Sequence, residues 1–186
     1  MGVPANRKIN QHRKKSNRGF SLIELLIVVA IILIIAAIAI PNMLKSRMSA
    51  NQAAAVSNLR TITTASVSYW VTYGNGYPPS LDSLGGPASG AATCNGAILI
   101  DEILSAPPYQ KTGYQFVFTG EGGNVPNVPT GCTPGFQGFL AATAPIKFGS
   151  TGTMSYCSSE PGIIHYDVTG ATAATEAACE ALPTLQ

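Results

Sequence analysis

The chain has 186 residues, of which 46% are hydrophobic and 11% are charged, and its formal net charge is +2. This balance is uneven: residues 1–19 hold six basic residues and no acidic one, whereas residues 20–186 hold five basic and nine acidic residues. The longer part is therefore net acidic, and the positive total does not indicate a nucleic-acid-binding surface. The six basic residues of the first segment are Arg7, Lys8, Arg13, Lys14, Lys15 and Arg18.

An unbroken apolar stretch follows this basic arm. Every residue from Leu25 to Ile40 is Leu, Ile, Val or Ala, and Phe20, Leu22 and Ile23 extend the stretch toward the arm. About 21 residues at a rise of 1.5 Å form a helix of roughly 30 Å, the thickness of the hydrocarbon core of a bilayer. A buried helix of a soluble domain is the alternative, but such a helix is rarely apolar on all sides over this length. The stretch therefore predicts a membrane-spanning helix.

A secretory signal peptide also begins with a basic arm, but its apolar region is shorter and a cleavage site of small residues follows it. Here Pro41, Asn42 and Met43 follow the apolar stretch, without that pattern. The sequence instead favours cleavage before the helix, after Gly19, which would remove residues 1–19 and leave the anchor in place. By the positive-inside rule the arm stays in the cytoplasm and the rest of the chain crosses the membrane. Binding of nucleic acid by the arm is the alternative.

Two segments of this region carry a family pattern. Residues Gly19 to Ile32 read GFSLIELLIVVAII, and residues Ala36 to Pro41 read AAIAIP. They closely resemble the N-terminus of type IV pilins, which the related pseudopilins of type II secretion share. Residues 50–62 and 77–81 also resemble the pilin helix and the exit from it. Many family members have glycine at the position of Leu33, so local melting of the helix in a filament is left open.

This resemblance implies a prepilin. A membrane-embedded peptidase and methyltransferase would cut after Gly19 and methylate the new amine of Phe20, and inner-membrane assembly machinery would draw the subunit into a helical filament of identical copies. The implied fold class is α+β, with a long N-terminal helix packed on a small antiparallel sheet. The precursor would be a single-pass protein of the inner (cytoplasmic) membrane with a cytoplasmic N-terminus. The assembled subunit would lie in an extracellular pilus.

Two residues at the junction bear on this chemistry. Gly19 has no side chain, so a peptidase can approach its peptide bond closely, although a flexible hinge is the alternative. Glu24 places a carboxylate in the apolar segment, at a cost of roughly 2.5–3.5 kcal/mol. We expect Glu24 to pair with the Phe20 amine of a neighbouring subunit and so to set the axial register. A helix capping box with Ser21, or a position near the lipid headgroups, are the alternatives.

The helix is expected to continue beyond Pro41, with a kink there because proline cannot donate to the helical ladder. An amphipathic spine over residues 42–73 follows, and the stop signal Gly74-Asn75-Gly76 ends it. Four aromatic residues near its end suggest packing against a sheet, with electron conduction or ligand stacking as alternatives. The apolar or small residues of the spine are Val56, Leu59, Ile62, Thr63, Ser66, Tyr69, Trp70 and Tyr73, and the aromatic set is Tyr69, Trp70, Tyr73 and Tyr77.

Residues 74–186 form the predicted globular head. Residues 74–112 are rich in Gly, Pro and Ser and suggest loops with one short helix, Ala97–Leu104. Strand-like runs separated by turn residues then predict three or four antiparallel strands on the spine helix. These runs are residues 113–119, 136–148, 153–157 and 162–168.

The four cysteines all fall in the head, on the side predicted to lie outside the cytoplasm, where an even number indicates two disulfides. Four cysteines allow three pairings, and sequence alone does not choose among them. We favour Cys94–Cys132 and Cys157–Cys179, because these close the two long irregular segments. A zinc site is the alternative, but the close CxxC spacing is missing.

No catalytic constellation emerges, so we expect no enzyme, no cofactor and no metal. His12 lies in the arm, and His165 is expected to form a surface pair with Asp167 on one strand face. Asp101 and Glu102 are expected to cap or solvate the short helix. Calcium binding is a remaining alternative, although the spacing of the acids matches no EF-hand loop. Its candidate ligands are Asp167, Glu176 and Glu180.

The sequence thus predicts a structural subunit of a type IV pilus. Its expected partners are further copies of itself in a helical filament, the prepilin peptidase and methyltransferase, the inner-membrane assembly machinery and, before assembly, the membrane; no specific nucleic acid is expected. A pseudopilin of a type II secretion system is the alternative. A membrane-anchored enzyme or binding module is a third class, but residues 74–186 offer no recognisable site for it.

Overall fold

The computed structural model describes residues 19–86 and 90–185 of the chain. The basic arm, including His12, lies outside the described residues. Helix α1 (Leu22–Tyr73) runs for 52 residues and passes through Pro41 without ending. The chain divides into two compact units after Pro41, so the N-terminal stretch of α1 belongs to one unit and Asn42–Gln186 to the other.

The second unit is an α+β head built on the C-terminal part of α1. Its sheet has five strands in the order β1-β2-β3-β4-β5, and every neighbouring pair is antiparallel. The strands are β1 (Gln110–Lys111), β2 (Tyr114–Asn124), β3 (Phe136–Pro145), β4 (Ser155–Ser159) and β5 (Ile164–Asp167). The short helices are α2 (Leu81–Leu84), α3 (Glu102–Ser105) and α4 (Glu176–Glu180).

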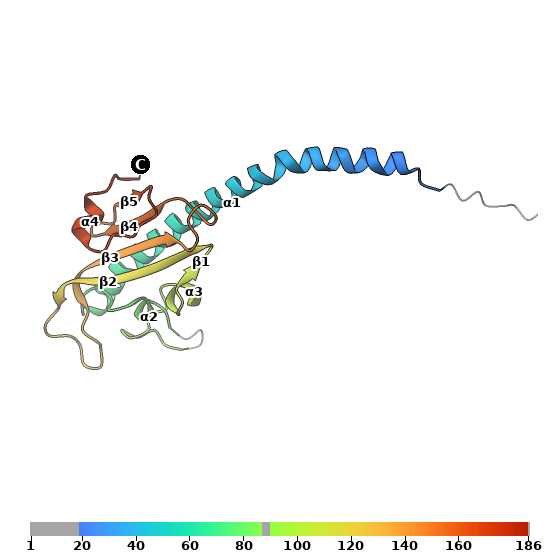
Figure 1. Cartoon of the computed structure of the whole chain (residues 1–186). Helices are drawn as coiled ribbons and strands as arrows, with labels where there is room; N and C mark the ends of the chain where they lie inside the picture. The colour runs from blue at the N-terminus through green and yellow to red at the C-terminus, as the bar shows by residue number, and fades with distance from the viewer. Residues whose placement is uncertain (1–18, 87–89, 186) are drawn as a thin grey trace, which may run out of the picture. The chain divides into compact units, whose positions relative to one another are not determined.

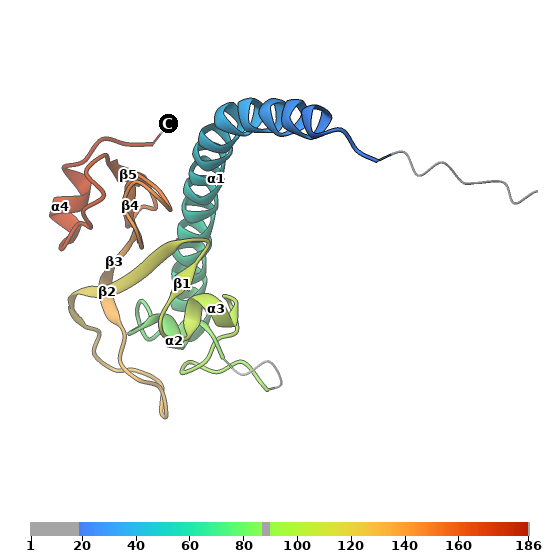
Figure 2. The same ribbon diagram turned by 45° about the vertical axis from the view of Figure 1, so that its right-hand side comes forward.

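The core lies between the sheet and one face of α1. In Figure 1 the head part of α1 crosses behind the strands, and both Figure 1 and Figure 2 show α2 and α3 on the β1 side and α4 on the β5 side. Leu59, Ile62 and Tyr69 of α1 are almost fully buried, and they join Phe116 and Phe139 of the sheet in one apolar cluster. The four-residue and three-residue steps between the buried α1 residues form a single helical stripe.

A smaller cluster covers the opposite face of the sheet. Leu140 and Ala142 of β3 point to this face, whereas Phe139 and Ala141 point toward α1. This alternation follows from the two-residue period of a strand. Cys157 and Cys179 complete the smaller cluster, because their disulfide ties α4 to β4. The central strands β3 and β4 are therefore buried on both sides.

Glycine ends the long helix and allows one close chain approach. Gly74 has φ of 66°, the left-handed conformation that commonly terminates a helix, and its N–H donates to Trp70 O. At Gly135 a Cβ would lie 2.1 Å from Tyr77 O, so only glycine fits between the end of the helix and β3. The expected stop signal at Gly74-Asn75-Gly76 is thus confirmed.

Several expectations about the head need correction. The sheet has five strands rather than three or four, because β1 lies in the segment expected to be loop and pairs with β2 across the turn at Thr112-Gly113. The predicted helix Ala97–Leu104 is wrong over most of its length. Residues 97–99 are irregular, with φ of 52° at Ile98, and their N–H groups donate to the carbonyls of Ser83, Gly85 and Leu84 in and after α2. Only α3 is helical, and Asp101 caps it by accepting from Leu104 N.

Candidate functional site

The junction before α1 leaves its backbone uncovered. Gly19 and Phe20 precede the first helical residue, both are exposed, and the Phe20 side chain is 71% accessible. A Cβ added to Gly19 would meet nothing within 4 Å, and no positive φ is recorded there. The fold of this chain therefore places no steric demand for glycine at residue 19. A demand for glycine would have to come from a molecule that approaches from outside.

Glu24 lies in the first turn of α1 and is exposed. Ser21 directly precedes the helix, and its carbonyl accepts from Leu25 N at 3.2 Å. Glu24 is the only charged residue between residues 20 and 44. Among the described residues, the one salt bridge joins Lys111 to Asp101, so no described cation pairs with Glu24. Its carboxylate is available to a partner outside the described chain.

The apolar stretch that follows has no cover within its own unit. Large side chains from Leu22 to Ile40 are all exposed, and this part of α1 is long and apolar enough to span a membrane, with none of its residues buried. Each large aliphatic side chain left in water forgoes about 1.5–3 kcal/mol of burial free energy. Such a surface requires lipid or protein around it.

The head contains the two disulfides that were favoured from the sequence. Cys94 and Cys132 have Cα atoms 5.5 Å apart and lie 38 residues apart, and Cys157 and Cys179 have Cα atoms 6.0 Å apart and lie 22 residues apart. By chain entropy, each bridge stabilises the fold by about 3–4 kcal/mol. Such bonds persist in oxidising compartments outside the cytoplasm.

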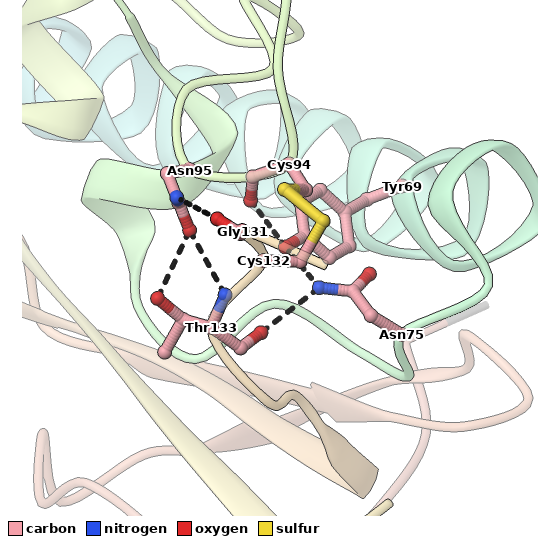
Figure 3. The surroundings of a disulfide bond; sticks show 7 residues. All are labelled: Tyr69, Asn75, Cys94, Asn95, Gly131, Cys132 and Thr133. Carbon is pink, nitrogen blue, oxygen red and sulfur yellow. Dashed lines mark hydrogen bonds between the residues drawn. A yellow bond between two sulfur atoms is a disulfide. The ribbon is translucent and has the colours of Figure 1, made fainter. Parts of the chain in front are cut away.

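A hydrogen-bond network joins the first disulfide to the end of α1, as Figure 3 shows. The hydroxyl of Tyr69 donates to Cys94 O and accepts from Asn75 Nδ2 at 2.9 Å. The same Asn75 amide lies 3.0 Å from Thr133 O, and Asn95 Oδ1 accepts from the backbone N–H and hydroxyl of Thr133. Burial raises the pKa of Tyr69 above its ordinary value, so this hydroxyl keeps its proton and can donate. The helix end thereby holds both cysteine loops.

The expected surface pair of His165 and Asp167 is wrong. His165 is buried, and its Nδ1–H donates to Leu182 O at 2.7 Å. It lies there because the C-terminal tail adds a bridge between His165 and Thr184 along the edge of β5. Asp167 instead accepts from Thr169 N at 2.8 Å and shapes the following turn.

The aromatic cluster near the end of α1 packs as expected, with one difference. Tyr77 contacts Phe139 with ring centroids 4.8 Å apart, and Tyr69 contacts Tyr73 at 5.1 Å. Trp70 also lies against Tyr77, at 4.7 Å, but it is 40% exposed and sits at the rim rather than in the core.

The acidic residues of the head form no metal centre. Within residues 19–86 and 90–185, no three His, Cys, Asp or Glu side chains come close enough to hold an ion. Glu176 has other acids nearby: its pKa is raised, first by partial burial and then by Glu180, Glu121 and Glu160. These acids concentrate negative charge at one end of the head.

Comparison with known proteins matches the N-terminal region. Residues 14–40 fit a family model described as the prokaryotic N-terminal methylation motif. The chain is also 56% identical over 54 residues to the type IV major pilin protein PilA of Myxococcus xanthus. The N-terminal region of this chain is therefore similar to that of a type IV pilin. The match covers 29% of this chain and spans 24% of the length of that relative, and no solved structure matches the chain.

The pilin-like motif thus coincides with the uncovered junction and the uncovered apolar helix. The sequence pattern pointed to Gly19, Phe20 and Glu24 here, but it missed two residues of the head. Asn75 was read only as part of a stop signal, although it is fully buried beside the first disulfide. Glu160 was not singled out, although it lines a groove beside α1. Its position next to a Pro-Gly turn was the one available signal.

Removing the Tyr69 hydroxyl tests the network around the first disulfide. We expect Tyr69→Phe to lower the free energy of unfolding by about 1–3 kcal/mol, because Cys94 O and the Asn75 amide lose their partner in a buried site. Denaturant unfolding of the detergent-solubilised, oxidised protein measures this change. Tyr73→Phe is the matched control, since the Tyr73 hydroxyl makes no hydrogen bond to a described residue. Equal effects of the two substitutions would contradict the assignment.

Removing the Glu176 charge tests the acidic end. Because the folded-state pKa of Glu176 is raised, its ionised form destabilises the fold at neutral pH, and the penalty is lost as the pH falls through that pKa. We expect Glu176→Gln to raise the unfolding free energy at pH 7 by less than about 1 kcal/mol and to have no effect at pH 4. Unfolding curves at both pH values measure this. Glu102→Gln, at the equivalent position of α3, should show no such gain, because Asp101 beside it is paired with Lys111.

Proposed function

We propose that the protein is a structural subunit of a type IV pilus, made as a prepilin and assembled into a helical filament of identical copies. The observation that supports this most is the coincidence of the methylation motif with an α-helix whose apolar surface nothing in its own unit covers. The same surface suits the bilayer before assembly and a core of like helices after it. Transfer between two apolar environments need not expose the helix to water.

The processing step follows from the open junction. A prepilin peptidase and methyltransferase cuts after Gly19 and methylates the new amine on Phe20. The exposed backbone of Gly19 and the lack of any internal need for glycine there support this role. Cleavage removes the basic arm, whose positive charges keep it cytoplasmic, and leaves the head on the outer face of the inner membrane. The two disulfides suit that oxidising side.

Glu24 acts in assembly rather than in folding. The new amine of Phe20 stays positive after methylation, and a carboxylate in an apolar surround requires a partner of that charge. Glu24 of one copy accepts the Phe20 amine of its neighbour, and this contact sets the axial register as the inner-membrane machinery adds subunits. Pro41 lies between the anchor and the head helix and is the place where α1 lacks one ladder donor.

Substitution of the residue before the cut tests processing. We expect Gly19→Val to abolish the shortened form, because its branched side chain blocks close approach of the peptidase to the bond. Mass spectrometry of the membrane-extracted protein gives the N-terminal residue and its methylation. Gly2→Val, the same change elsewhere in the arm, should be processed normally. Normal shortening of the Gly19→Val protein, or a native chain that still begins at Met1, would contradict the proposed processing.

Substitution of Glu24 tests the register contact. We expect Glu24→Gln to leave cleavage and membrane insertion intact but to lower the yield of sheared filaments at least about tenfold, because the neighbour's amine loses its charged partner. Glu24→Asp keeps the charge and should retain part of the yield. Immunoblots of sheared and membrane fractions, with electron microscopy of the filaments, measure both. A Glu24→Gln subunit that assembles at the normal rate would remove the register role.

A further inference from the structure

A partly apolar groove runs along the head part of α1. It lies between α1 and the turn that joins β4 to β5. The section of the groove near Trp70, Tyr77 and Glu160, called the distal section, has a volume of about 330 Å³. Trp70 is 40% exposed there and Val71 is 81% exposed, while Tyr77 lies at the groove with its ring buried. Val67 and Pro161 line both this section and an adjoining hollow of about 440 Å³. The head itself supplies nothing that covers these side chains.

The two ends of the groove carry opposite charge. Glu160 is exposed and lines the distal section beside Tyr77, whose pKa is raised, first by burial and then by this carboxylate. Glu176 lies near this end of the groove, since its carboxylate also raises the pKa of Tyr77, and Glu121 lies near Glu176. Arg60 lines the adjoining hollow. An occupant of the distal section must therefore be apolar and positively charged.

One segment of the same chain has this chemistry. Met43 is 75% exposed and Leu44 is 56% exposed, and the basic residues Lys45 and Arg47 follow on the same helical segment. The loop Ile146–Phe148 is also exposed and apolar, but it carries one basic residue instead of two. Lys111 is excluded, because it is bound to Asp101.

We propose that the distal section of this groove receives residues 43–47 of a second copy of the chain. Met43 and Leu44 cover Trp70 and Val71, and Lys45 and Arg47 face Glu160 and its acidic neighbours. The contact rests on the proposed function, since it needs copies aligned side by side along a filament. With parallel helices, bringing Leu44 of one copy level with Trp70 of another requires an axial offset of roughly 39 Å at 1.5 Å per residue.

Charge reversal in the full-length protein, expressed in a filament-forming strain that lacks its own copy, tests this contact. We expect Glu160→Lys alone, and Lys45→Glu with Arg47→Glu, each to lower the yield of sheared filaments about fivefold or more through like-charge repulsion. The protein carrying all three changes should return to within about twofold of wild type, because the charges are again opposite. Glu102→Lys is the control, because Glu102 is an exposed acid of α3, which lies on the β1 side of the sheet rather than at the β4–β5 turn.

A photo-crosslink gives a second readout that does not depend on charge. Benzoylphenylalanine replaces Val71, which is exposed, so the head fold is retained. Irradiation of assembled filaments should link residue 71 of one copy to residues 43–47 of another, as mass spectrometry of the digested dimer would show. This readout decides the matter if the Lys45 and Arg47 changes disturb membrane insertion.

The outcomes separate this inference from the proposed function. Links from residue 71 to residues 146–148 or to another protein, or filaments without any link from residue 71, would overturn the contact. Failure of the triple reversal to recover filaments, although the triple variant inserts normally in the membrane, would also overturn the contact, as expected if Lys45 and Arg47 bind lipid headgroups instead. A wild-type chain that is never shortened and forms no filament would instead overturn the proposed function itself.

Discussion

The dominant constraint on this molecule is the apolar surface of α1 before Pro41, which the described residues of its own unit do not cover. A head fold can bury Leu59, Ile62 and Tyr69 against a sheet, but the side chains from Leu22 to Ile40 meet no partner in their unit. Burial of each one in lipid or protein gains about 1.5–3 kcal/mol, so the chain must stay in an apolar environment throughout its life. The proposed membrane residence and self-assembly would both meet that requirement.

The head has a different constraint, which is the small size of its core. Its sheet is covered on both faces, by α1 on one side and by the cluster around Cys179 on the other. The irregular segments that no strand holds are fixed by the two disulfides, and Tyr69 and Asn75 link the first of these to the helix end. Helix α1 thus provides the exposed apolar stretch of one unit and a core element of the other.

The parts that sequence predicted well are those with a strong period or a strong composition. The long helix followed from an apolar run and a three-and-four-residue stripe, and the α+β class followed from the resemblance. The prediction of Trp70 as a core residue was wrong because the buried stripe runs through Leu59, Ile62 and Tyr69, and Trp70 lies one residue to its side. The two-residue strand β1 and the four-residue helix α2 are too short to show a period.

His165 was misplaced for a different reason: its burial depends on a tail that sequence could not position. A strand pattern gives the face of a residue but not what lies over it, and here the bridge to Thr184 and the carbonyl of Leu182 cover the ring. Asn75 is the same kind of case, because it is fully buried only once Thr133 and Cys94 are brought to the helix end. Long-range contacts decided both positions, whereas local pattern decided the helix.

Glu24 connects the energetics of the anchor to assembly. In lipid a lone carboxylate costs roughly 2.5–3.5 kcal/mol, so an isolated subunit is less stable in the membrane than its apolar helix alone would make it. Under the proposed pairing, a neighbour's Phe20 amine offsets that cost only when two copies are side by side. The charge therefore favours the filament over the dispersed precursor, while the apolar residues around it gain about equally in either place. An uncharged helix of the same length would lack this preference.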